Sequence, residues 1–142
     1  MIQVAASAIH GTGVFATTRI GAGTFVDRYQ GRRYTSRQAA RKDWAQAVTY
    51  VFGLSNGGLI DAAEGGNATR HLNHSCDPNC VAYEESAGRG RLEIAFYALR
   101  DISPGEELVL DYSLQVDEME DDALFACLCG AAACRGTMLG PR

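Results

Sequence analysis

Apolar side chains alternate with other residues most regularly in the second half of the chain. Leu92, Ile94 and Phe96 are each separated by a single residue of another type. A period of two is typical of a strand with one buried face. Residues 81–84 also predict a strand, and Gly88-Arg-Gly between the two segments predicts a turn. We therefore expect a β-hairpin in which residues 81–84 pair with residues 91–98.

Several other short apolar runs, separated by turn sequences, predict further strands, at residues 14–16, 25–29, 49–54, 59–60 and 108–110. Helices are predicted only over residues 37–47, with Ser36 as the cap, and over the acidic residues 117–125. Many short strands with a few short helices indicate a mainly β domain. Residues 64–80 follow no period, and a long irregular segment of this kind is often functional.

Length and charge narrow the possible functions. A chain of 142 residues fits one domain. No apolar run approaches the ~18 residues of a membrane span, and no secretory signal is visible, so we expect an intracellular protein of the cytoplasm or nucleus with no membrane partner. The net charge of −4 argues against direct nucleic-acid binding and is compatible with a basic partner. The oligomeric state stays open.

Three of the five cysteines, Cys127, Cys129 and Cys134, are clustered near the C-terminus. Disulfides are rare in a reducing compartment, so these thiols are expected to bind metal or to be free. Three thiolates at short spacing predict a structural Zn²⁺ site if a fourth ligand comes from elsewhere, with Cys76 and Cys80 as candidates. Reduced or redox-active thiols are the alternative interpretation.

Four segments, taken in order, resemble the SET-domain family of protein lysine methyltransferases. They are a glycine loop (residues 9–16), a central block that contains Asn-His-Ser-Cys (residues 50–54, 60–62 and 66–80), a block ending in Asp-Tyr (residues 98–112) and a cysteine tail similar to the post-SET tail (residues 127–136). The resemblance implies a SET (β-clip) fold of small curved sheets over residues 1–114. It also implies a post-SET zinc tail over residues 115–142 in the same globular unit. In this fold the C-terminal segment forms a pseudoknot with the loop that holds Asn73 and His74.

The resemblance also implies an activity, the transfer of a methyl group from S-adenosylmethionine to a lysine amine of a basic protein such as a histone or histone-like tail. The lysine must be neutral to attack, although its free pKa is about 10.4. A narrow apolar channel beside the positive sulfonium lowers this pKa by desolvation and charge repulsion. A site lined with aromatic side chains is therefore expected, without a strong base.

By the same resemblance, Tyr112 is the first candidate for the catalytic residue and Tyr50 the second, and both would line the lysine channel with Leu110. The residues expected to bind the cofactor are Gly11, Thr12, Gly13, Arg70, His71, Asn73 and His74. The expected zinc ligands are Cys76, Cys127, Cys129 and Cys134. Glu107 is expected to be structural and Cys80 to be a core residue.

Some features depart from the family pattern or leave alternatives open. Leu110 stands where the family often has Phe or Tyr, which favours di- or trimethylation, and Asp27 replaces a more usual Glu. No cysteine-rich segment precedes the glycine loop, so its role is expected to be dispensable or supplied by a partner. The acidic residues 117–122 form either a solvated face or a surface that attracts a basic substrate. A SET-like binding module without turnover and a zinc-stapled interaction domain are the alternative functions.

Overall fold

The computed structural model describes residues 1–41, 50–112, 129, 131–132 and 134–137. Most of the elements in these ranges are short strands, which confirms the mainly β class. In chain order they are β1 (Ile2–Ala6), β2 (Thr12–Ala16), β3 (Phe25–Arg28), β4 (Arg32–Tyr34), α1 (Ser36–Arg41), β5 (Val51–Gly53), β6 (Leu59–Asp61), the 3₁₀ helix η1 (Ala68–His71), β7 (Asn73–His74), β8 (Cys80–Ser86), β9 (Leu92–Ala98) and β10 (Glu107–Leu110).

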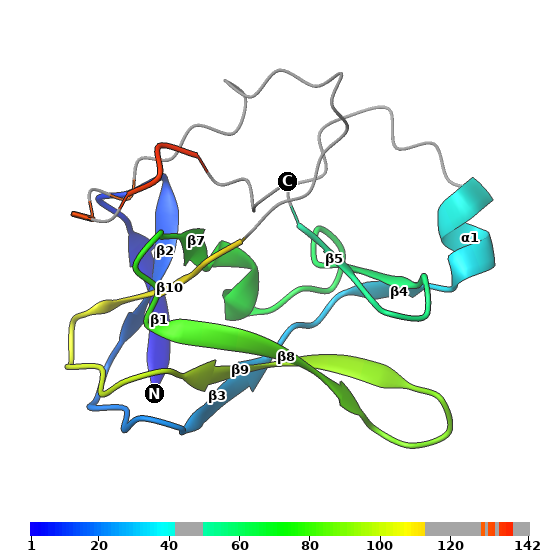
Figure 1. Ribbon diagram of the computed structural model, residues 1–142, viewed down its shortest axis with the longest axis horizontal. Coiled ribbons are helices and arrows are strands. Elements are labelled where there is room, and N and C mark those ends of the chain that lie inside the picture. Colours follow the sequence, from blue (N-terminus) through cyan, green and yellow to red (C-terminus); the bar gives the residue numbers. More distant parts are fainter. Residues whose placement is uncertain (42–49, 113–128, 130, 133, 138–142) are drawn as a thin grey trace.

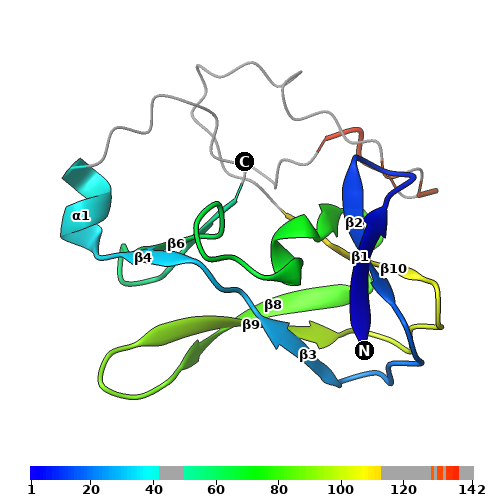
Figure 2. The ribbon, with the colours of Figure 1, turned by 180° about the vertical axis from the view of Figure 1, so that it is seen from behind.

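The strands form three small sheets, with the orders β1-β2-β10-β7, β3-β9-β8 and β4-β6-β5. The first and third sheets lie at opposite ends of the long axis, and the β8–β9 hairpin extends along one side of the molecule (Figure 1). Seen from behind, β3 runs beside β9 (Figure 2). The predicted hairpin is confirmed, with its register running from Cys80 opposite Ala98 to Ser86 opposite Leu92.

The core lies where the three sheets meet. Val14, Ile60 and Phe96 are each 1% exposed or less and come one from β2, one from β6 and one from β9, which belong to the three different sheets. The rings of Tyr29 and Phe52 lie 5.0 Å apart, and each lies 6.1 Å from the ring of Phe96. These contacts join the sheet of β9 to the sheet of β5. Large aromatic side chains bury much apolar area, so this cluster contributes strongly to the stability of the core.

Strand β10 lies beside the irregular loop of residues 64–80. It pairs in parallel with β7, so that Val109 lies opposite Asn73 and Leu110 opposite His74. Asn79, 1% exposed, secures the other side, since its Oδ1 accepts from the Val109 N–H and its Nδ2 donates to the Glu107 carbonyl, both at 2.8 Å. This is the juxtaposition that the resemblance implied for the pseudoknot.

The strand predictions at residues 14–16, 25–29, 50–54, 59–60 and 108–110 are confirmed within one or two residues at each end, and residue 49 of the predicted strand 49–54 lies outside the described residues. The Ser36 cap is wrong. Helix α1 begins at Ser36 itself, and Thr35 caps it, because the Thr35 hydroxyl accepts from the Gln38 N–H while the Gln38 side chain accepts from the Thr35 N–H. Residues 42–47 of the predicted helix, and all of the predicted helix 117–125, lie outside the described residues.

The sequence did not predict β1, β4 or β7. Strand β1 is exposed along most of its length and β4 contains two arginines, so neither shows an apolar face. Strand β7 has two residues and exists through its pairing with β10. Within the described residues, no helix has both the length and the apolar character needed to cross a bilayer.

Candidate active site and cysteine cluster

Tyr112 lies two residues beyond β10 and is held at both ends. Its main-chain N–H donates to Nδ1 of His74 at 2.9 Å, and its hydroxyl donates to the main-chain carbonyl of Leu72. Its ring meets the His74 ring edge-on, with 5.3 Å between centroids. The residue as a whole is 37% exposed, and its hydroxyl is held against the Leu72 carbonyl. Such a side chain can act on a bound molecule while its hydroxyl stays fixed.

The hydroxyl of Tyr112 stays protonated at neutral pH. Its burial raises the pKa above that of a free tyrosine, and the nearby Glu107 and Tyr50 raise it further. A neutral phenol can orient a reacting group by hydrogen bonding, but it is a poor proton acceptor. The Tyr112 hydroxyl is therefore suited to orienting a reacting group rather than to removing its proton.

Tyr50 and its neighbours form an aromatic and basic group close to Tyr112. The His71 ring meets the Tyr50 ring edge-on at 6.5 Å, and the Arg70 guanidinium lies 5.9 Å from the Tyr50 centroid. The hydroxyl of Tyr29 donates to the Tyr50 carbonyl at 2.5 Å and so fixes the main chain there. Burial, and next the Arg70 charge, lower the pKa of His71, which favours a neutral ring at pH 7. Sequence reasoning missed Tyr29, whose signal was its place in the Arg-Tyr-x-Gly segment.

Asn73 joins the glycine loop to the strands beneath it. Its Nδ2 lies 2.9 Å from Oε2 of Glu107 and 3.1 Å from Oγ of Ser7 and the carbonyls of His10 and Thr12. An amide has two hydrogens, so these four acceptors share them. The Ser7 hydroxyl also donates to Glu107 at 2.8 Å. The Asn73 side chain, expected to meet the cofactor, is thus engaged inside the protein.

Two glycines shape this loop for different reasons. Gly11 has φ of +46°, a backbone conformation that glycine adopts without strain, and the space around it is open. Gly13 is buried, and a Cβ there would lie 2.5 Å from Oε2 of Glu107. Gly13 is therefore required by internal packing, whereas Gly11 and Thr12 are exposed and could face a ligand.

Gly13→Ala should destabilise the protein by about 1–3 kcal/mol, because the added methyl must displace a carboxylate held by Ser7 and Asn73. Gly21→Ala is the matched control, since its nearest neighbour would be the Thr24 hydroxyl at 3.6 Å, and it should change stability by about 0.5 kcal/mol or less. Urea unfolding monitored by circular dichroism measures both. Equal midpoints for the two variants would contradict this account of the loop.

The sulfur atoms of Cys76, Cys129 and Cys134 all lie within 4.8 Å of one another. Four thiolates at 2.3 Å from a tetrahedral Zn²⁺ would be about 3.8 Å apart, so these three positions fit zinc after small shifts. Cys127, the expected fourth ligand, lies outside the described residues. Cys80 is 1% exposed in the core, and burial raises its pKa to about 12, which makes it a poor thiolate ligand.

His74 lies between this cluster and Tyr112. It is 3% exposed, and burial is the main cause that lowers its pKa, so the ring is neutral at pH 7. Because Nδ1 accepts from the Tyr112 N–H, the ring proton belongs on Nε2, which lies 3.4 Å from Sγ of Cys76. The imidazole, like the Asn73 amide, is thus engaged within the protein. Leu110 is 5% exposed and packs in the core.

The structure brings most of the expected site residues to one region and adds others. Tyr50, Arg70 and His71 form one group. His74 contacts both Tyr112 and Cys76. Sequence reasoning missed the residues that hold this group in place, because each acts across a long separation in the chain: Ser7, Tyr29, the Leu72 carbonyl, Asp111 and Arg135.

Comparisons with known proteins place these features in context. A family model described as SET domain matches residues 11–113, a range that includes both the glycine loop and Tyr112. A protein of Saccharomyces cerevisiae named histone-lysine N-methyltransferase, H3 lysine-4 specific, is 37% identical over 140 residues, which are 95% of this chain and 13% of the yeast protein.

Proteins of the same name from Candida albicans and Neurospora crassa are each 35% identical over 140 residues. These matches cover 95% of this chain, but 13% of the Candida protein and 10% of the Neurospora protein. The chain thus spans a small part of the length of the relatives it matches.

Proposed function

The chain belongs to the SET-domain family, and from this premise we propose that it is a protein lysine N-methyltransferase. It would transfer a methyl group from S-adenosylmethionine to a lysine amine of a basic protein, a histone or histone-like tail. The relatives are named for lysine 4 of histone H3, so the H3 tail is the first substrate to test. Such a substrate would require the protein to work in the compartment that holds histones.

The observation that carries this proposal is the fixed, neutral phenol of Tyr112. Its hydroxyl is held by the Leu72 carbonyl and its main chain by His74, while the residue as a whole is 37% exposed. A group fixed in this way can align two bound molecules, and alignment supplies several kcal/mol of a barrier.

The chemistry asks the protein to supply orientation and desolvation. S-adenosylmethionine provides an electrophilic methyl group on a sulfonium, and the lysine nitrogen accepts it after losing a proton. Reaching the neutral amine at pH 7 costs about 4–5 kcal/mol for a free lysine. Tyr50 would form an aromatic wall that lowers this cost by desolvation and also stabilises a methylated ammonium by cation–π contact. The Tyr112 hydroxyl would orient the nitrogen lone pair.

The cofactor would lie along the glycine loop and η1. Gly11 and Thr12 are exposed in the loop, and Arg70 and His71 are partly exposed in η1. Because the side chains of Asn73 and His74 bind other parts of the protein, these two residues would contribute main-chain groups and the shape of the pocket. Gly13 would contribute by letting the loop lie close to Glu107.

The cysteine cluster would hold a structural Zn²⁺. Cys76, Cys129 and Cys134 would supply three thiolates and Cys127 the fourth, which leaves no open position for substrate. The ion would tie the tail to the loop that follows β7. Leu110 has no hydroxyl to hold a water beside the amine, so we infer that more than one methyl group can be added.

Methyl transfer from radiolabelled S-adenosylmethionine tests the proposal. The purified, zinc-loaded protein is incubated with histones, a ribosomal protein fraction and an unrelated lysine-rich protein. Label on lysine supports a methyltransferase and points to the substrate class. Cofactor binding without label on any substrate would favour a binding module, and absence of cofactor binding would favour a zinc-stapled scaffold. Cofactor binding is read from the shift in melting temperature.

A further inference from the structure

We propose that Asp111 and Arg135 are positioning residues, whose ion pair holds the cysteine tail against the segment that carries Tyr112. This pair is called the clasp below. The inference rests on the proposed function, since it assigns a role in the methyl transfer to two residues that do not themselves touch the reacting atoms.

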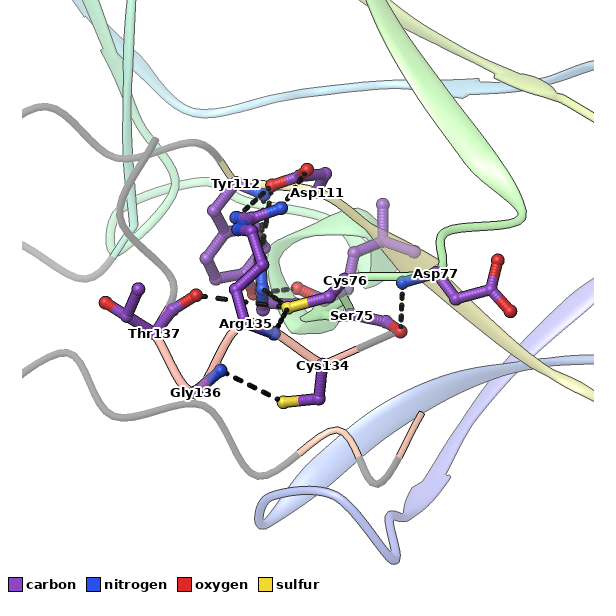
Figure 3. A network of polar contacts seen from close by, with 11 residues as sticks. Ser75, Cys76, Asp77, Asp111, Tyr112, Cys134, Arg135, Gly136 and Thr137 are labelled. Atoms are coloured by element: carbon purple, nitrogen blue, oxygen red, sulfur yellow. Dashed lines mark hydrogen bonds and ion pairs between the residues drawn. The ribbon is translucent and has the colours of Figure 1, made fainter. Parts of the chain in front are cut away.

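The clasp has the geometry of a strong ion pair. Arg135 donates from one terminal nitrogen to Oδ2 of Asp111 at 2.8 Å and from the other to Oδ1 at 3.1 Å (Figure 3). The two side chains are 35% and 29% exposed. By contrast, the Arg19–Asp101 pair at the surface is 67% and 61% exposed. A two-pronged pair that is partly shielded from water is stronger and more directional than an exposed one.

The clasp joins the tail to the cysteine cluster on one side. Arg135 follows Cys134, and its main-chain N–H donates to Sγ of Cys76 at 3.2 Å (Figure 3). The N–H of Gly136 donates to Sγ of Cys134 at 3.3 Å. Arg135 therefore contacts the cysteine cluster through its main chain and Asp111 through its side chain.

On the other side, the clasp lies directly beside Tyr112. The last main-chain bond of this segment to its neighbouring strand is the Ser75 N–H to the Leu110 carbonyl, at 2.8 Å. Beyond it, the main chain around Tyr112 is held by side chains, with Asp111 bound to Arg135 and the Tyr112 N–H bound to His74. His74 itself contacts Cys76. Two connections from the Tyr112 segment thus converge on Cys76, one through Arg135 of the tail and one through His74 of β7.

Small displacements matter in such a site. A shift of about 1 Å in a positioning group can cost roughly a hundredfold in rate. Loss of the clasp leaves the sheets and the core intact, because Asp111 and Arg135 contribute to neither. The expected consequence is a slower chemical step with substrate affinity largely kept.

The test compares Arg135→Glu, the charge swap Arg135→Asp with Asp111→Arg, and the control Arg19→Glu at the exposed pair. We expect Arg135→Glu to lower kcat by about 10–100-fold with KM changed by roughly threefold or less, and the swap to recover at least about tenfold of that loss. Arg135→Lys keeps the positive charge but cannot form the bidentate hydrogen bonds, so its kcat should lie between those of wild type and Arg135→Glu. Arg19→Glu should match wild type.

A second readout does not depend on turnover. Zinc release from the loaded protein to a coloured chelator should be faster in Arg135→Glu and not in Arg19→Glu. If Arg135→Glu keeps the wild-type kcat and zinc release, the clasp has no positioning role. If the wild type transfers no methyl group to any substrate, the proposed function fails, and the clasp is then judged by zinc release alone.

Discussion

Tyr112→Phe should lower kcat by about 10²–10³-fold, the usual cost of removing one hydrogen-bonding group that acts in a transition state. The substitution removes the hydroxyl that donates to the Leu72 carbonyl but keeps the ring against His74 and the main-chain bond to Nδ1. Binding of S-adenosylhomocysteine, measured by calorimetry, should therefore stay within about threefold of wild type, because the fold and the cofactor site are unchanged.

Tyr83→Phe is the matched control for this experiment. Tyr83 is 54% exposed on β8 and lies outside the group around Tyr112, so its variant should have wild-type kcat. A Tyr112→Phe enzyme that retains a third or more of the wild-type kcat would mean that the hydroxyl does not act in the reaction. A parallel loss in both variants would point to a general effect on the protein.

Removal of the expected zinc should abolish methyl transfer while leaving the β core folded. Chelation, or Cys76→Ser, breaks the cluster to which Tyr112 is connected through His74. Activity should fall to about 1% of wild type or less, since metal binding and the order of such a tail are coupled. Far-UV circular dichroism should change little, because the buried core comes from residues 14–110.

Cys80→Ala provides the control for the cysteine cluster. Cys80 is buried in the core, away from the cluster, so this variant should bind zinc as wild type does and lose about 1 kcal/mol of stability from the small cavity. Atomic absorption gives the zinc content, and the labelled-methyl assay gives the activity. A zinc-free protein with full activity would contradict the structural role of the tail.

Local patterns predicted the parts of the fold that have an apolar face. The alternation around Ile94 and Phe96 predicted β9, and the Gly88-Arg-Gly turn predicted the hairpin. In the structure Arg89 at this turn has φ of +52°. Strands β1, β4 and β7 were missed because pairing with distant partners holds them. Ile2 pairs with Ala16, and Asn73 with Val109, and no period within either segment signals that pairing.

The site shows the same division between local pattern and long-range contact. Resemblance to a family pointed to Tyr112 and Tyr50, and it assigned Asn73 and His74 to the cofactor through both their side chains and their main chains. The structure gives those side chains other partners, such as Glu107 for Asn73 and the Tyr112 N–H for His74. The Asp111–Arg135 pair is missed for a related reason. Any acidic and any basic residue can pair, so their sequence positions carry no signal.

One measurement tests the central claim most directly. The zinc-loaded protein is incubated with S-adenosylmethionine and a peptide of the histone H3 N-terminal tail, beside the same peptide with its lysine 4 replaced by arginine, and both are read by mass spectrometry. The first peptide should gain the mass of one or more methyl groups on that lysine, and the second should not. An unchanged H3 peptide, together with no methyl transfer to any lysine-rich protein, would contradict the account.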